Sequence, residues 1–381
     1  FSGDIEEGNI AIWQDRIAGI GDYTNGKKII DLKGKYVSPG LINGHVHIES
    51  SMLHISRYAE AVVPRGVTGI VTDLHEIANV KGIPGIKYIL SCAKSLPLTM
   101  HLMAPSCIPA THLETAGARL TPEDINNILS FDETIGLGEM MNFPGVLFAD
   151  SHVLAKISAS QGKVIDGHAP GLGGNDLNAY IASGITSDHE STRFSEAKEK
   201  LRKGMYVMIR EGSSEKNLEE LLPLVTDKTY KRCLFVVDDR SCTDLSNDGD
   251  IDAVVRKAIK LGLEPVRAIQ LATINTAERF NIRGVGAIAP GYMANIAVLS
   301  NLRRFKVDMV FHHGKLVAQG GKALFSTSVH DNKQMTHTMK VRPFRIESLR
   351  ISADQWHYPI IEIVPNQIIT RSVNEKHKII D

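Results

Sequence analysis

The sequence has no surplus of charge of either sign, because 43 lysine and arginine residues balance 43 aspartate and glutamate residues. A protein that follows nucleic-acid phosphates needs a basic surplus, so this balance argues against general nucleic-acid binding. No apolar run reaches the roughly 18 residues of a membrane-spanning helix. The chain also lacks internal repeats and low-complexity stretches. We therefore expect a folded protein with a hydrophobic core that binds neither nucleic acid nor membrane.

Cysteine is scarce as well, with four residues in 381 and no C-x-x-C motif. This usage favours free thiols in a reducing compartment over a disulfide framework, so we expect a cytoplasmic protein. The missing motif also excludes the zinc deaminases that act on nucleic acids, since these use it to hold their metal.

Both ends of the chain show short apolar alternation broken by glycine and aspartate, which is typical of small antiparallel β structure. We expect residues 1–38 and 284–381 to form one discontinuous, apparently incomplete β-sandwich domain. The strands that this alternation predicts are 10–13, 16–20, 28–32, 287–291, 295–299, 307–317, 360–364 and 367–369.

Residues 39–283 have a different texture, in which short apolar runs alternate with helix-like stretches about every 27 residues. Eight such units over about 250 residues predict a closed (β/α)₈ barrel, that is, a TIM barrel. The helical stretches are 54–64, 121–130, 195–204 and a long one over 250–279. Each apolar run ends in a polar residue, and these residues are His47, His75, Ser106, Glu139, His168, His189, Glu211 and Asp238.

In such a barrel the C-terminal ends of all strands face one shared mouth, so residues far apart in sequence meet there. His45 and His47, at positions i and i+2 of the first strand, point to the same side and can both reach one cation. Glu139 ends the fourth strand, where a carboxylate can bridge two cations. Alone, each of these is more often a structural or rim residue.

Three further strand ends complete the set. His168 and His189 end neighbouring strands, and each can give an imidazole to a second metal. Asp238 ends the last strand, where a carboxylate can bind metal and accept a proton from activated water. Six ligand-type residues at the correct strand ends predict metal-assisted hydrolysis. His75 and Glu76 are not needed for this set, and they could contact substrate, hold a proton or form an additional metal site.

Several stretches resemble the amidohydrolase superfamily and, within it, the adenine deaminases of bacteria and archaea. The longest are VSPGLINGHVHIESSM at 37–52, DLHEIANV at 73–80, GEMMNFPGV at 138–146 and DGHAPGL at 166–172. Shorter ones are 105–110, 187–190, 208–213, 238–240, 272–277 and 286–291, and together the resemblance covers residues 9–370. Members of that family normally continue into a further C-terminal domain, and they begin with a strand that precedes Phe1 here.

The resemblance implies hydrolysis of adenine to hypoxanthine and ammonia, in purine salvage, at two divalent metal ions. Manganese or iron is expected, and zinc is possible. His45, His47 and Asp238 would bind the first ion and His168 and His189 the second, with Glu139 bridging them. Water activated by the metals would attack C6 of adenine, and Asp238 would take its proton.

The roles of the remaining site residues are hypotheses. Glu76 or His75 would protonate or hold a ring nitrogen, and Ser106, Arg240 and Asp239 would contact the base. We expect a homo-oligomer with adenine and water as its small-molecule partners.

Two alternatives stay open. One is a cyclic amidase similar to dihydroorotase or hydantoinase, although many of these bridge their metals with a carboxylated lysine and here the fourth strand offers Glu139 and no lysine. The other is a catalytically inactive, truncated barrel that serves as a scaffold, although an inactive relative should have lost at least one ligand.

Overall fold

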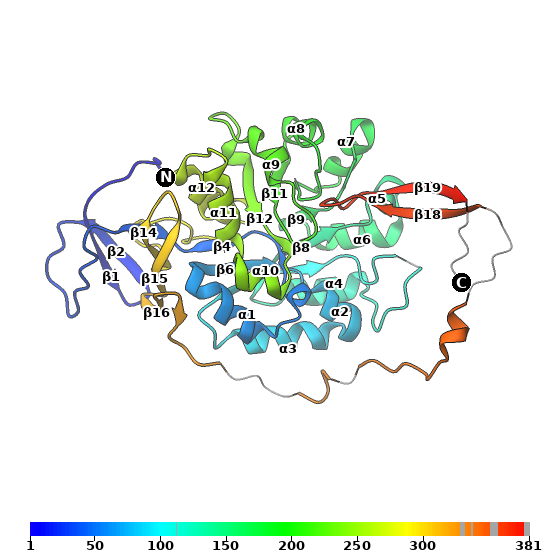
Figure 1. Ribbon diagram of the computed structural model, residues 1–381, viewed down its shortest axis with the longest axis horizontal. Helices are drawn as coiled ribbons and strands as arrows, with labels where there is room; N and C mark the ends of the chain where they lie inside the picture. Colours follow the sequence, from blue (N-terminus) through cyan, green and yellow to red (C-terminus); the bar gives the residue numbers. More distant parts are fainter. Residues whose placement is uncertain (112, 328–331, 337, 351–356, 377–381) are drawn as a thin grey trace.

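A closed barrel of parallel strands forms the centre of the computed structural model, which describes residues 1–111, 113–327, 332–336, 338–350 and 357–376. Eight strand positions succeed one another around the barrel, and helices surround them (Figure 1). In order the strands are β4 (Leu41–Asn43) with β5 (Val46–His47), β6 (Val67–Thr72), β7 (Thr99–Pro105), β8 (Thr134–Met140), β9 (Val164–Gly167), β10 (Ser187–Asp188), β11 (Tyr206–Arg210), and β12 (Cys233–Val236) with β13 (Asp238–Asp239).

The barrel closes through two sheets and two short connections. The strands pair in the orders β4-β6-β7-β8-β9 and β10-β11-β12, all in parallel. The amide of Thr186 donates to the carbonyl oxygen of Ile165 at 3.3 Å, which joins β9 to the second sheet. The amide of Asp238 donates to the carbonyl oxygen of His45 at 3.0 Å, where β13 pairs with β5. The (β/α)₈ barrel predicted from the spacing of apolar runs is thereby confirmed.

The helices follow the strands as the alternation predicted, with one error. The stretch 250–279 is not one long helix, because Gly262 with φ of 101° ends the first segment and Pro265 starts the next. Thr121 caps the helix over 122–129, since its side chain accepts from the amide of Asp124. The helices are α1 (Ile55–Val62), α2 (His75–Lys81), α3 (Ile83–Ala93), α4 (Pro122–Leu129), α5 (Phe143–Leu147), α6 (Ser151–Ala159), α7 (Gly174–Ala182), α8 (Phe194–Arg202), α9 (Leu218–Leu221), α10 (Cys242–Asn247), α11 (Ile251–Lys260), α12 (Pro265–Leu271) and α13 (Ile274–Arg279).

Two antiparallel sheets lie beside the barrel. Their strands come from the segments before and after the barrel in the sequence. One pairs β1 (Asn9–Trp13) with β2 (Arg16–Gly21). The other has the order β17-β16-β15-β14-β3, so that a strand before the barrel pairs with strands after it. Its strands are β3 (Tyr36–Pro39), β14 (Ile296–Asn301), β15 (Lys306–His312), β16 (Lys315–Gln319) and β17 (Lys322–Ala323).

A small apolar core between these sheets makes them a sandwich. Ile17 from β2 is buried against Ile296, Val298 and Phe311 of the larger sheet. The strands predicted at 28–32 and 287–291 are wrong, because the structure describes both segments as irregular chain. Leu32 and Ile288 of these segments still pack against this cluster, whereas Ile29 and Ile30 are exposed. Some apolar residues therefore join the core without forming a strand.

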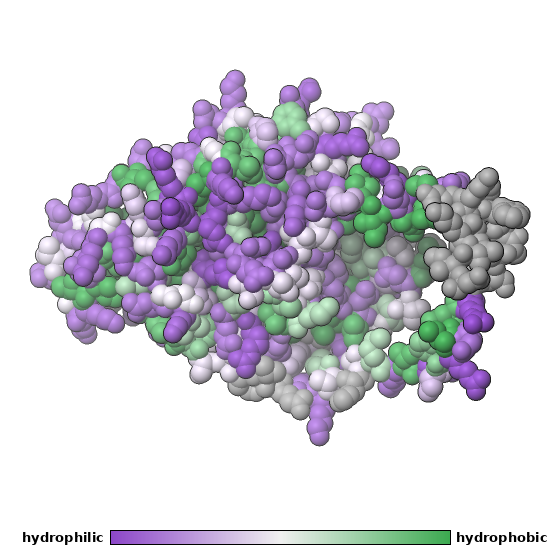
Figure 2. Space-filling view, viewed as in Figure 1, coloured by the Kyte–Doolittle hydropathy of each residue, from purple (hydrophilic) through white to green (hydrophobic). Residues whose placement is uncertain are grey.

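A separate hairpin, β18 (His357–Ile363) and β19 (Thr370–Lys376), follows the larger sheet. The strand predicted at 367–369 is wrong, because 364–369 form the turn and β19 begins only at Thr370. That turn touches the barrel, where the amide of Lys216 donates to the carbonyl oxygen of Asn366 at 3.1 Å. Hydrophobic residues gather on the right of Figure 2, where Figure 1 places this hairpin, and Ile361 and Ile363 are more than three-quarters exposed.

None of the helices in the described ranges is both long and apolar enough to cross a membrane. The domain boundaries at 38/39 and 283/284 stay a prediction, and the last residues of the second segment, 377–381, lie outside the described part of the chain.

Candidate metal centre

The strand ends bring the six expected ligand residues into one place, although the sequence spreads them over almost 200 positions. All except His168 are at most 5% exposed, and the side chain of His168 is 19% exposed. The barrel wall is tight around them. A Cβ atom on Gly167 would lie 2.3 Å from the carbonyl oxygen of Ser187, so only glycine lets β9 and β10 approach as they do.

The first and last strands supply one cluster of ligand atoms. The Nε2 atoms of His45 and His47 lie 3.1 Å apart. The Oδ1 atom of Asp238 lies 3.0 Å from Nε2 of His47 and 3.6 Å from Nε2 of His45. The Oε1 atom of Glu139 lies 3.4 Å and 3.8 Å from the same two nitrogens. Four ligand atoms from three strands therefore converge on one point.

A second cluster lies on the other side of Glu139. Its Oε2 atom is 3.0 Å from Nε2 of His189 and contacts Nδ1 of His168 closely. The two oxygens of one carboxylate thus face two different pairs of imidazoles. This is the arrangement by which a carboxylate bridges two metal ions.

The spacing of the ligand atoms fits divalent ions. Two atoms that each lie about 2.1 Å from one ion are about 3.0 to 3.6 Å apart at ordinary coordination angles, and most of the separations in the first cluster fall in that range. Protein groups alone leave the site poorly satisfied, since both ring nitrogens of His189 are buried and neither makes a well-aligned hydrogen bond in the described part of the chain, even though Nε2 lies 3.0 Å from Glu139. The His and carboxylate groups present therefore suit a pair of divalent metals.

The charges in the site respond to one another. Burial lowers the pKa of His189, but the carboxylates of Glu139, Asp238 and Glu190 outweigh it and raise the pKa to about 10. Burial raises the pKa of Glu139, yet the imidazoles of His168 and His189 overcome it and hold the pKa well below its usual range. The pKa of Asp238 is also held well below its usual range, because hydrogen bonding to His47 and the charge of Arg210 outweigh burial. Both carboxylates are ionised and ready to bind cations.

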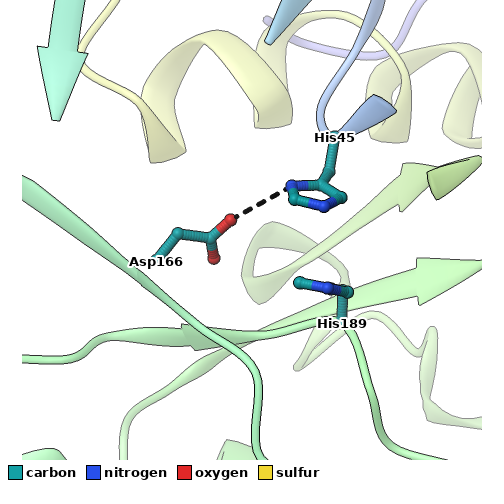
Figure 3. Close-up of side chains that lie close together, drawn as sticks. All are labelled: His45, Asp166 and His189. Carbon is teal, nitrogen blue, oxygen red and sulfur yellow. Dashed lines mark ion pairs between the residues drawn. The ribbon is translucent and has the colours of Figure 1, made fainter. Parts of the chain in front are cut away.

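Asp166 is a site residue that the sequence analysis missed. Its Oδ2 atom lies 3.5 Å from Nδ1 of His45, and Figure 3 shows it facing that ring beside His189. The rings of His45 and His189 stack with centroids 4.1 Å apart. A carboxylate on the far nitrogen of a ligand imidazole fixes the orientation of the ring. The two-residue spacing to His168 was the available signal, because it places both side chains on one side of β9.

Asp73 is a second site residue that was not predicted. Like Asp166, it lies two residues before a predicted site residue, here His75. Its Oδ1 atom lies 3.3 Å from Nδ1 of His47, and its Oδ2 atom lies 3.0 Å from Nδ1 of His75. Glu76 stands next to them, with Oε1 3.5 Å from Nε2 of His75 and a side chain that is 34% exposed. Burial lowers the pKa of His75, but Asp73 outweighs it and raises the pKa to about 10. His75 and Glu76 therefore form an accessible, polar edge of the candidate metal site.

The three residues expected to contact substrate differ in their surroundings. Asp239 is partly buried, and its Oδ1 atom accepts a hydrogen bond from Ser50. The hydroxyl of Ser106 donates to the carbonyl oxygen of Glu139. The guanidinium of Arg240 is buried, and its Nε donates to the carbonyl oxygen of Gly249 at 2.9 Å. Ser106 and Arg240 thus donate hydrogen bonds to backbone carbonyl groups around the site.

Two buried cations also escaped the sequence analysis. Arg210 at the end of β11 contacts Glu190 and Asp238. Lys200 on α8 donates to Asp188, Glu196 and the carbonyl oxygen of Ala169. Nothing in their local sequence distinguishes them from solvated basic residues, because only the closed barrel buries them.

Comparisons with known proteins agree with this geometry. The family model described as "Amidohydrolase family" matches residues 36–317. The chain is 61% identical over 376 residues to "Adenine deaminase" of Dehalococcoides mccartyi (strain ATCC BAA-2266 / KCTC 15142 / 195), and the match covers 99% of this chain and 66% of that protein. It is 46% identical to "Adenine deaminase 2" of Carboxydothermus hydrogenoformans, over 98% of this chain and 65% of that protein. The chain thus spans slightly less than two thirds of these relatives.

Solved structures share the fold at low identity. A variant of the atrazine chlorohydrolase of Arthrobacter aurescens aligns with a TM-score of 0.63 and 14% identity, over 87% of this chain and 94% of that chain. Enamidase aligns with a TM-score of 0.59 and 16% identity, over 84% and 91% of the two chains.

Proposed function

The chain belongs to the amidohydrolase family, and from that premise we propose that it is an adenine deaminase, which hydrolyses adenine to hypoxanthine and ammonia. The observation that carries the proposal is the carboxylate of Glu139, whose two oxygens face two separate imidazole pairs. The identity of 61% to a relative named adenine deaminase supports the choice of substrate. Purine salvage, a cytoplasmic location and a homo-oligomeric state remain predictions from the sequence.

Two divalent metals, manganese or iron, are the proposed cofactors. His45, His47 and Asp238 would hold the first ion, while His168 and His189 would hold the second. Glu139 would bridge them. When bound, such ions supply Lewis-acid activation of water near neutral pH.

Asp238 is the proposed proton carrier. Its carboxylate is ionised and lies beside the imidazoles proposed for the first ion, where it would accept a proton from the attacking water and pass it to the departing amine. The overall balance then consumes one water and releases one ammonia for each adenine. Because Asp238 is buried, bulk water does not compete for that proton.

The neighbouring groups would orient the purine. Protonated His75 or the accessible carboxylate of Glu76 would hold a ring nitrogen. Asp239 would accept a hydrogen bond from the base. Ser106 and Arg240 would define the shape of the pocket through the backbone that they support.

The test is metal analysis of the purified chain, followed by assays of ammonia release from adenine and adenosine and of ring opening of dihydroorotate. About two metals per chain and release from adenine alone would support the proposal. Opening of dihydroorotate without release from adenine would favour a cyclic amidase, and a metal-free, inactive chain would favour a scaffold.

A further inference from the structure

Strand β11 contributes no expected metal ligand, yet its last residue, Arg210, lies at the candidate metal site. This side chain is 1% exposed, although a guanidinium keeps its charge in any folded protein. A buried cation is stable only when paired acceptors replace water. Arg210 lies in the stretch 208–213, to which the sequence analysis gave no role.

The acceptors of Arg210 are two carboxylates from other strand ends. One terminal nitrogen contacts Glu190 Oε1 and donates to Asp238 Oδ2 at 2.5 Å. The other donates to Glu190 Oε2 at 2.9 Å. Only the planar fork of arginine can hold both carboxylates in this way, because the lysine ammonium is a point charge on a flexible stem. The guanidinium therefore links the end of β11 to the start of β13 and to the loop that follows β10.

The two carboxylate oxygens of Asp238 consequently contact different groups. Oδ2 is held by Arg210, while Oδ1 lies 3.0 Å from Nε2 of His47. The backbone of Asp238 has φ of 60°, in the left-handed region that residues other than glycine rarely adopt. A residue in this conformation needs surrounding contacts to fix it. Arg210 supplies the contact to the side chain, and the backbone is fixed by the hydrogen bond that the amide of Asp238 donates to the carbonyl oxygen of His45.

We propose that Arg210 is a positioning residue, which holds Oδ2 of Asp238 so that Oδ1 alone faces His45 and His47. Its consequence for catalysis rests on the proposed function, since Asp238 is the proton carrier of that reaction. Its consequence for metal binding does not, because a misdirected Oδ1 weakens the first ion whatever the substrate is.

The experiment compares Glu190→Gln with the double variant Arg210→Met/Glu190→Gln. The double variant removes one cation and one anion together, so the net charge of the wild type is retained. In Glu190→Gln, Arg210 still holds Asp238, while any effect of Glu190 on the second ion is common to both variants. Manganese titration of the apo-protein should show one of two ions bound about 10–100-fold more weakly in the double variant than in Glu190→Gln.

Kinetics with adenine add a second readout. The double variant should lose kcat relative to Glu190→Gln with little change in KM, because proton transfer and not base recognition is disturbed. Arg210→Lys should fall between wild type and the double variant. If wild type does not act on adenine, the proposed function fails, and the manganese titration still decides the role of Arg210.

Equal manganese affinities in the two Glu190→Gln backgrounds would overturn the proposal. Urea unfolding of the apo-proteins identifies a variant that does not fold. If the double variant is unfolded, Arg210→Lys decides: weaker binding of one ion in a folded protein supports positioning, and wild-type binding of both ions overturns it.

Discussion

The Nε2 atom of His47 lies 3.0 Å from the Oδ1 atom of Asp238, so the first and last strands of the barrel meet at this contact. The pairing of β5 with β13 that closes the barrel is what brings the two residues together. The barrel closes and the candidate metal site assembles together, so a chain that does not close its barrel has no complete site.

Replacing Asp238 with asparagine should abolish deamination while leaving the fold intact. An amide has the shape of the carboxylate but cannot take a proton from water, and loss of a general base costs about 10²–10⁴-fold in kcat. Ammonia release from adenine with metal content measured in parallel checks this. Near-normal turnover of the metal-loaded variant would refute the assignment. Asp227→Asn, at an exposed carboxylate that pairs with Arg267 on α12, is the control.

Replacing Glu139 with glutamine should weaken both metal ions, whereas replacing His168 with asparagine should weaken only one. The reason is that the two oxygens of Glu139 face different imidazole pairs, while His168 belongs to a single cluster. Metal content after dialysis against graded chelator concentrations distinguishes the two. Loss of a single ion in Glu139→Gln would show that Glu139 does not bridge.

Lys200→Met should destabilise the protein by about 3–5 kcal/mol, because it leaves Asp188 as a buried charge without its cation. Lys200 is fully buried and donates to Asp188 at 2.9 Å. Lys203→Met, at the C-terminal cap of the same helix, is the matched control, and its partly exposed pair with Glu199 should contribute less than about 1 kcal/mol. Urea unfolding of the apo-proteins measures both. Equal losses in the free energy of unfolding of the two variants would mean that burial does not increase the contribution of the Lys200 ion pair.

Metal affinity should rise with pH up to about 10. His189 carries a proton in the apo-protein at neutral pH because its pKa is raised to about 10, and a metal ion must displace that proton. By the same shift, His189 stabilises the apo-fold below pH 6.5, and this contribution is lost as the pH rises through 10. Calorimetric titration in buffers of different ionisation enthalpy should reveal proton release at pH 8. Binding without proton release would contradict the shift.

Acid should destabilise the junction between the barrel and the larger antiparallel sheet at His312. Burial lowers the pKa of His312 to about 3, and its Nε2 atom lies 3.0 Å from the hydroxyl of Thr99 on β7. The unfolded chain takes up this proton near pH 6.5, so the contribution is present above 6.5 and is lost as the pH falls towards 3, by up to about 1.4 kcal/mol per pH unit. Thermal unfolding of His312→Gln should show a flatter acid limb than wild type. His152→Gln, at an exposed position, should leave that limb unchanged.

The sequence by itself determined the barrel and the six clustered residues of the candidate metal site. Apolar runs about 27 residues apart specify buried parallel strands, and polar residues at their ends must face one mouth once the strands close. This is why His45 and Asp238 could be placed together from spacing alone, and why the motifs around them identified the family.

Tertiary structure alone decided the surroundings of those residues. Asp73 and Asp166 orient imidazoles through contacts between different strands, and Arg210 and Lys200 become buried cations only because the barrel encloses them. No local feature separates a basic residue on the surface from one that holds a carboxylate in the core. Periodicity reports which side of an element is buried, whereas the pairing of charges depends on distances that exist only after folding.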